Sequence, residues 1–262
     1  MNEAPALLDL AVRSAHAAGA LLRDRFGGHQ SGLSSKSSRT DLVSDADRAA
    51  EELIVGMIRR ERPDDGLLAE EGAAAGGATG VRWLVDPLDG TINYLWGIPH
   101  WSVSIAATCD AGDLVGVVHD PNRDETFTAA SGAGAHLDST RLERTALDDV
   151  SEALVGTGFS YVAEQRDRQA RLLVDWLPRV RDVRRFGSAA LDLAWVAAGR
   201  LDAFYETGLS PWDWAAGAML VRQAGGAVTQ VPAASGGVDG ILAARPGLTE
   251  PLLELIRPLP AR

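Results

Sequence analysis

Asp86 and Asp89 stand three positions apart in "WLVDPLDGTINYL" (residues 83–95), where an apolar run ends. If Pro87, between them, fixes a turn, both carboxylates and the Leu88 carbonyl point into one pocket. Such an all-oxygen pocket suits a hard cation such as magnesium. The spacing therefore predicts a divalent-cation site.

A Gly-Thr pair follows the second aspartate, and two interpretations of it remain open. In one, the backbone N–H groups of Gly90 and Thr91 lie at a helix start and bind a phosphate group. In the other, Asp89 or Thr91 only caps a helix that begins near Ile92. The motif alone does not choose between a phosphate site and a helix cap.

Other acids follow the same pattern. Glu70 and Glu71 end the apolar run of "GLLAEEG" (66–72), Asp213 opens a helix in "WDWAAG", and a polar helix start holds Asp41, Asp45 and Asp47. Singly, these acids are typical of solvated side chains or helix N-caps. Four acidic elements, each at a strand end or a helix start, are hard to ascribe to capping alone.

Metal-carboxylate chemistry beside a phosphate site implies phosphoryl transfer to water. The sequence has no Walker-type glycine loop, which argues against a nucleotide-driven kinase, and no Gly-x-Ser-x-Gly, which argues against a serine hydrolase. The histidines lie outside the acidic motifs. His100 and His119 sit in strand-like surroundings and are expected to be structural.

Charge and cysteine content narrow the range of partners and cellular locations that fit this protein. A formal net charge of −11, with no basic cluster denser than "RVRDVRR" (179–185), argues against nucleic acid as a main partner. The single cysteine, Cys109, excludes an intramolecular disulfide, and charged residues interrupt the N-terminal segment where a secretory signal would be apolar. We predict a cytoplasmic protein without a membrane segment.

Hydrophobic periodicity predicts the elements that position the acids. Residues 44–61 have the helical period, with Ser44 or Asp45 as cap, and residues 72–80 read as a flexible loop. Strands are expected within 66–72 and 81–90, and a hairpin at 101–109 and 113–120 that 125–130 extends.

The second half alternates between strands and helices. Strands are expected near 153–160, 182–186, 202–206, 227–231 and 240–244, with helices near 164–177, 188–199, 212–225 and 248–256. We therefore predict an α+β half over residues 1–145, with most of the metal ligands, and an α/β half over residues 146–262.

The motifs "DLVSDAD", "AEEG", "WLVDPLDGTINY", "FGSAA", "FYETG" and "WDWAAGAMLVRQAGG" together resemble the inositol monophosphatase family of magnesium-dependent, lithium-sensitive sugar phosphatases. The resemblance implies an α+β fold, a layered αβαβα sandwich of the inositol monophosphatase and fructose-1,6-bisphosphatase type. It also implies two or three Mg²⁺ ions per active site, a homodimer, and hydrolysis of myo-inositol monophosphate or a similar polyol phosphate by a metal-activated water.

The resemblance further implies a role for each matching residue. The first magnesium would be held by Glu70, Asp86 and the Leu88 carbonyl, and the second by Asp86, Asp89 and Asp213. Thr91, paired with Asp47, resembles the family's couple that orients and helps to deprotonate the attacking water, while Glu71 would support the site from close by. The substrate would contact Asp89, Gly90, Thr91 and Asp213, with its hydroxyls near Gly187, Ser188, Ala189 and Glu206.

Three positions depart from the family pattern, namely Ala69, Trp96 and Pro211, and none of them removes a ligand. The entrance to the active site, or a dimer contact, could be reshaped by Trp96, His100 and Trp101. Such a change would affect the choice of substrate more than catalysis.

Other functions on the same fold stay open. One is a phosphatase for histidinol phosphate, whose amino group Glu206 could pair with. Another is a phosphatase for an adenosine bisphosphate, which would need a basic residue near the site that the sequence does not reveal. A third is a regulatory protein that contacts RNA or the transcription machinery.

Overall fold

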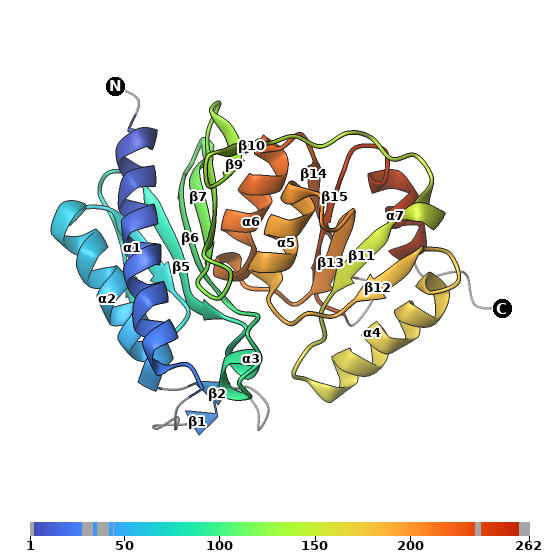
Figure 1. Cartoon of the computed structure of the whole chain (residues 1–262), viewed down its shortest axis with the longest axis horizontal. Helices are drawn as coiled ribbons and strands as arrows, with labels where there is room; N and C mark the ends of the chain where they lie inside the picture. Colours follow the sequence, from blue (N-terminus) through green and yellow to red (C-terminus); the bar gives the residue numbers. More distant parts are fainter. Residues whose placement is uncertain (1–2, 28–33, 36–41, 44, 234–236, 257–262) are drawn as a thin grey trace.

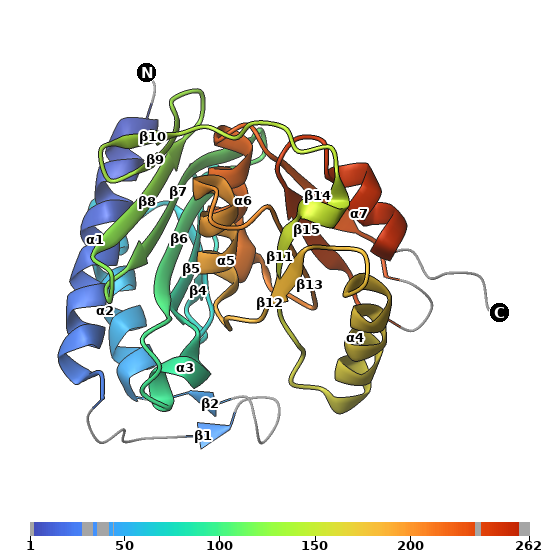
Figure 2. The ribbon, with the colours of Figure 1, turned by 45° about the vertical axis from the view of Figure 1, so that its right-hand side comes forward.

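The computed structural model describes residues 3–27, 34–35, 42–43, 45–233 and 237–256. Its elements form layers (Figure 1): helices α1 (Ala4–Arg25) and α2 (Asp45–Glu61), an eight-stranded sheet, helices α5 (Ala189–Ala198) and α6 (Pro211–Gln223), a five-stranded sheet, and outer helices α4 (Ala163–Trp176) and α7 (Thr249–Ile256). Figure 2 shows the same order after a turn of 45°. The αβαβα sandwich expected from the resemblance is confirmed.

The larger sheet belongs to the first half of the chain. Its order is β10-β9-β8-β7-β6-β5-β3-β4, and β3 and β5 are its one parallel pair among the described strands. The strands are β3 (Gly66–Ala69), β4 (Ala74–Ala75), β5 (Arg82–Asp89), β6 (Ser102–Cys109), β7 (Gly112–Asp120), β8 (Glu125–Ala130), β9 (Gly134–Leu137) and β10 (Thr140–Leu142). The predicted hairpin and its extension are confirmed as β6, β7 and β8.

Some elements were not predicted. β9 and β10 extend the large sheet at one edge, and β4 lies inside the stretch 72–80 that was expected to be a loop, because its two alanines pair with β3. A short 3₁₀ helix (Val150–Glu152) precedes the second sheet, and β1 (Ser34–Ser35) pairs with β2 (Leu42–Val43) apart from both sheets. Asp41 and the proposed cap Ser44 lie outside the described residues.

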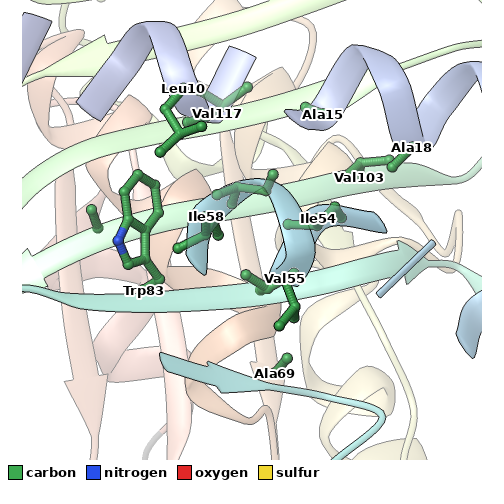
Figure 3. Close-up of a cluster of buried hydrophobic side chains, with 14 of the residues drawn as sticks. Leu10, Ala15, Ala18, Ile54, Val55, Ile58, Ala69, Trp83, Val103 and Val117 are labelled. Carbon is green, nitrogen blue, oxygen red and sulfur yellow. The ribbon is translucent and has the colours of Figure 1, made fainter. Parts of the chain in front are cut away.

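Helices α1 and α2 cover the outer face of the large sheet. Ala15 and Ala18 of α1 are fully buried, so small side chains let the helix backbone approach the strands closely. Ile54 and Ile58 of α2, one helical turn apart, are buried as well. Figure 3 shows these residues in one cluster with Trp83, which projects from β5 near Ile58. Burial of apolar side chains on this face holds β5, and the acids at its end, in place.

Helices α5 and α6 lie between the two sheets, which explains their composition. Most residues of α5 are buried, and all of the buried ones except Asp192 are apolar, as expected of a helix covered on both sides. The Ser188 side chain caps its start by accepting from the Leu191 N–H, and Gly199 ends it in the left-handed region at φ 81°. In the described ranges, no helix is both long and apolar enough to cross a membrane.

The five-stranded sheet has the order β12-β11-β13-β15-β14. Its strands are β11 (Leu154–Thr157), β12 (Asp182–Arg184), β13 (Ala203–Thr207), β14 (Ala227–Val231) and β15 (Gly240–Ala244), which confirms the predicted alternation with helices. Along β13, Phe204 packs among the central helices and Tyr205 among the outer ones. Because side chains alternate along a strand, the next residue, Glu206, returns to the central side.

Candidate active site

The two motif aspartates leave β5 on the same face because the strand bulges. Asp86 pairs with Ser104 of β6 and Asp89 with Ser102, so three steps along β5 match two steps along β6. Side chains three positions apart in a regular strand point to opposite faces, and the extra residue restores a common face. Pro87 lies in this bulge, where its missing N–H leaves no ladder bond unmade. The expected turn at Pro87 was wrong: the chain stays in the strand.

Glu70 reaches the same place from the neighbouring strand. β3 runs parallel to β5, with Ala69 beside Val85, and the Glu70 N–H donates to the Val85 carbonyl at 3.1 Å. The next position on each strand is an acid, and the carboxyl groups of Glu70 and Asp86 form a hydrogen bond. Burial raises the pKa of Asp86 well above its usual range, and the charge of Glu70 raises it further.

Asp89 connects the two halves of the molecule. Its carboxylate accepts hydrogen bonds from the Ser188 hydroxyl at 2.6 Å, the Ala190 N–H at 2.7 Å and the Ala189 N–H at 3.3 Å. It therefore caps the first turn of α5, where Ala190 lies 101 positions further along the chain. Burial nevertheless raises the pKa of Asp89 to about 6, since these donors only partly offset the lost hydration and the charge of Glu70.

The Gly-Thr pair begins α3 (Thr91–Leu95), a single short helix. Gly90 is its N-cap, in the left-handed region at φ 94°, and no side chain caps it. A side chain at Gly90 would come within 3.0 Å of the His100 carbonyl oxygen, so glycine is required on both counts. The interpretation in which Asp89 or Thr91 caps this helix was wrong, because Asp89 caps α5 instead.

The Thr91 hydroxyl lies between two acceptors. Its Oγ1 is 3.2 Å from Asp47 Oδ1 and 3.0 Å from the Leu88 carbonyl oxygen. Asp47 comes from the first turn of α2 and is fully buried. A hydroxyl has one proton to donate, and its lone pairs can still accept a hydrogen bond from a water in the cavity. The predicted pair of Thr91 and Asp47 is therefore in contact.

Asp213 enters the site from the start of α6. Its Oδ2 accepts the Ser210 N–H at 2.7 Å, as the third helical residue does in a capping box. The same carboxylate lines the cavity that holds the other acids. Burial raises the pKa of Asp213 well above its usual range, with added repulsion from Glu70 and Asp89. Asp213 thus serves as a helix cap and as a member of the acidic cluster.

The acids of the cavity are suitable ligands for a cation, but their oxygens lie too far apart to coordinate one together in this structure. Within the described residues, no three acidic, histidine or cysteine side chains lie at metal-ligand distances. Mutual repulsion explains this, because Asp89 and Asp213 turn oxygens toward backbone N–H groups instead. A divalent cation would offset the repulsion, and carboxylate and carbonyl oxygens are the donors that magnesium prefers. The donor set therefore fits magnesium.

One cavity of about 140 Å³ joins these acids to the predicted substrate residues. Its lining comprises Glu70, Asp86, Leu88, Asp89, Gly90, Thr91, Gly187, Ala189, Glu206 and Asp213, together with Phe159, Tyr161 and Arg185. Ser188 and Asp47 lie behind this wall, bonded to Asp89 and Thr91. Burial raises the pKa of Glu206 to about 7, against the opposing charge of Arg185.

A larger groove of about 660 Å³ opens between α4 and β14. Its lining is mostly apolar, and Asp175 is the one acid among the described residues that form it. A lone carboxylate can neither hold a divalent cation nor activate a water beside a phosphate group. The chemistry therefore places the active site in the smaller cavity.

Three residues of the cavity wall were not predicted. Phe159 and Tyr161 follow β11, and Arg185 follows β12. The sequence revealed no clear candidate for a basic residue near the site, and the structure provides one, Arg185. The available signal was the position of Arg185 in "RRFGSAA", two residues before the predicted substrate residue Gly187.

Glu71 does not line the cavity, and its support of the site stays a prediction. Its N–H donates to Glu51 Oε2 at 2.7 Å, and Glu51 Oε1 accepts the Ala73 N–H at 3.0 Å. The buried Glu51 thus anchors the segment that follows Glu70, a role that was not predicted. Asp45, by contrast, is exposed and pairs with Arg48 at 3.1 Å.

The aromatic residues after α3 divide into core and surface. Trp101 is fully buried against Phe26 and Tyr94, so the expectation that it shapes the entrance was wrong. His100 is also buried, and it lies in the loop before β6 rather than in a strand. Trp96 is 66% exposed and remains available to shape the surface beside the site.

Comparison with known proteins agrees with this geometry. The model of the inositol monophosphatase family matches residues 5–258. The chain is 42% identical to the inositol-1-monophosphatase SuhB of Mycobacterium tuberculosis (strain H37Rv), over 98% of this chain and 95% of the relative. It is 43% identical to the Nus factor SuhB of Escherichia coli K12, over 85% and 84%. The solved structure of the extragenic suppressor protein SuhB from Bartonella henselae superposes with a TM-score of 0.88 at 37% identity, covering 96% of this chain and 98% of that chain. The chain therefore belongs to the inositol monophosphatase family.

Proposed function

We propose that this chain is a magnesium-dependent phosphomonoesterase that hydrolyses myo-inositol monophosphate, or a similar polyol phosphate, to the alcohol and inorganic phosphate. One observation carries the proposal: four carboxylates from three elements converge in a cavity that also contains Thr91 and Glu206. They are Glu70 after β3, Asp86 and Asp89 on β5, and Asp213 on α6. A structural role alone does not require acids to gather so closely that the charge of Glu70 raises the pKa values of Asp86, Asp89 and Asp213.

Magnesium would be held by Glu70, Asp86, the Leu88 carbonyl, Asp89 and Asp213. When bound, it supplies a lowered pKa for the attacking water and stabilises negative charge on the leaving oxygen. The chain contributes the positions of these oxygens, through the bulge in β5 and the first turns of α5 and α6.

Thr91 and Asp47 would orient the attacking water. With the Thr91 hydroxyl donating to buried Asp47, an oxygen lone pair of Thr91 is left to accept a hydrogen bond from the water. The water oxygen then attacks phosphorus in line with the ester oxygen, the P–O ester bond breaks, and the alcohol leaves with a proton. This arrangement needs no covalent bond between the enzyme and the phosphoryl group.

Glu206 would select the alcohol. It lies at the end of β13, next to the loop of Gly187 and Ala189 that lines the same cavity. A carboxylate there accepts hydrogen bonds from two neighbouring hydroxyls, as a polyol offers. It would also accept from an amino group, so histidinol phosphate remains the rival substrate.

Phosphate release tests the proposal directly. Purified protein should hydrolyse inositol 1-phosphate faster than histidinol phosphate, lose turnover in EDTA and regain it with magnesium. Asp213→Asn should abolish most of the activity, whereas Asp45→Asn, at an exposed acid of another helix start, should keep it. Full activity in chelator, or full activity of the Asp213 variant, would rule the mechanism out.

A second candidate comes from the relative named a Nus factor, to which the chain is 43% identical. A transcription role of that kind would depend on surface contacts and not on the buried acids. The Asp213→Asn variant separates the two functions, because a protein that acts through contacts alone would retain its role with the phosphatase disabled.

A further inference from the structure

Arg185 is the one basic side chain among the described residues that line the active-site cavity. The rest of the wall is dominated by carboxylates, with Glu206 on the side that would receive the alcohol. Contacts with magnesium would account for the acids of the metal site, and contacts with the substrate hydroxyls would account for Glu206. Neither role uses the guanidinium of Arg185.

The backbone directs this side chain across the substrate loop. Gly187, at φ +93°, lies two residues after Arg185, and a side chain there would collide with Nη1 of Arg185. It would also come within 3.1 Å of Asn93 Nδ2, which holds the loop by donating to the Phe186 carbonyl at 2.8 Å. The missing side chain at Gly187 therefore makes room for the guanidinium beside the cavity.

The guanidinium is also available to a ligand. The described residues give Arg185 neither a hydrogen bond nor an ion pair, although it is close enough to lower the pKa values of Glu206 and Asp192 against the effect of burial. Its neighbour Arg184 differs, since it pairs with Asp182 at 2.6 Å and donates to the Val183 carbonyl at 3.0 Å. Of these two adjacent arginines, Arg184 is held by contacts within the protein, whereas Arg185 lines the cavity.

We infer that Arg185 forms a second anion subsite, so that the preferred substrates are polyol phosphates with a further anionic group, a second phosphate or a carboxylate, on the alcohol. The inference rests on the proposed phosphatase function and leaves its chemistry unchanged. A guanidinium binds an anionic oxygen pair through two parallel N–H bonds, which a neutral hydroxyl cannot match. Glu206 then takes the hydroxyls and Arg185 the second anion.

A matched pair of substrates tests the subsite. Inositol 1-phosphate and inositol 1,4-bisphosphate differ by one phosphate, and kcat/KM for each is measured in wild type, Arg185→Gln, Arg185→Lys and the control Arg184→Gln. In Arg185→Gln, the ratio of bisphosphate to monophosphate kcat/KM should fall by roughly ten- to a hundredfold, as expected from loss of a charged hydrogen bond. Arg185→Lys should recover part of the ratio, and Arg184→Gln should keep the wild-type ratio.

The outcomes separate this inference from the proposed function. An unchanged ratio in Arg185→Gln, or an equal fall in Arg184→Gln, would overturn the subsite. Equal losses on both substrates would make Arg185 a support for Glu206 and would also overturn it. If wild-type protein hydrolyses the monophosphate but not the bisphosphate, the subsite is overturned and the phosphatase function stands. If wild-type protein hydrolyses neither substrate, both are overturned.

Discussion

Asp89 has two roles in the structure, and replacing it with asparagine should separate them. The carboxylate caps α5 through Ala190 and Ser188, and it belongs to the acidic cluster. An asparagine has the same shape, and its amide oxygen can still accept the backbone N–H of Ala190. Asp89→Asn therefore keeps most of the cap and removes the charge.

The size of the effect follows from the pKa of Asp89, which burial raises from 3.8 to about 6. Each unit corresponds to about 1.36 kcal/mol, so the ionised carboxylate costs the metal-free protein about 3 kcal/mol. A carboxyl whose pKa is raised by folding adds stability at pH values below its pKa in the unfolded chain. That stability is lost as the pH rises through its pKa in the folded protein. Metal-free wild type should lose it between about pH 4 and pH 6, and Asp89→Asn, which does not titrate, should not.

Thermal unfolding in EDTA from pH 4 to pH 7.5 measures this difference. Relative to wild type, the melting temperature of Asp89→Asn should rise by roughly 6–10 °C as the pH increases, since about 1 kcal/mol shifts a chain of this size by a few degrees. Asp45→Asn, at an exposed acid, should show no such rise. With magnesium present, Asp89→Asn should lose activity about a hundredfold or more. A melting difference that does not change with pH would refute the reasoning.

Two further predictions concern buried histidines and the alcohol site. Burial lowers the pKa values of His100 and His119 to about 4, so both stay neutral in the folded protein while the unfolded chain protonates near pH 6.5. The free energy of unfolding should fall between pH 7 and pH 5 by about 2 kcal/mol per histidine. His100→Phe keeps an aromatic ring beside Phe186 and should make this fall smaller, as measured by chemical denaturation at each pH. An unchanged pH dependence in the variant would contradict this. Glu206→Ala should lower kcat/KM for inositol 1-phosphate by roughly ten- to a hundredfold and that for p-nitrophenyl phosphate far less, and equal losses would show that Glu206 supports the metal site instead.

Much of the fold and part of the site could be predicted from local patterns. The helical period of residues 44–61 and the alternation in the β6–β7 hairpin reflect which side chains face the core, and this depends on neighbours a few positions away. The acids at the ends of β3 and β5 were identified from local sequence as well, because each follows an apolar run and four such acidic elements are hard to ascribe to capping alone. The resemblance to a family then connected motifs that lie far apart in the chain.

Long-range contacts decided the remainder. Sequence spacing places Asp86 and Asp89 on opposite faces of a regular strand, and only pairing with Ser104 and Ser102 reveals the bulge that puts them on one face. The loop after α3 offered no local signal that Trp101 would be buried, since it packs against Phe26, which follows α1 and lies far away in the sequence, as well as against Tyr94.

The sequence alone therefore determined the chemistry on offer: which acids exist, and at which strand ends and helix starts they lie. The tertiary structure decided how that chemistry is arranged. Asp89 binds Ala190, in the first turn of a helix, 101 positions away, and Arg185 joins the cavity from the end of a strand in the other sheet. Contacts of this kind form only when distant segments pack together, and the free energy of that packing depends on the burial of the whole core and not on any local run of residues.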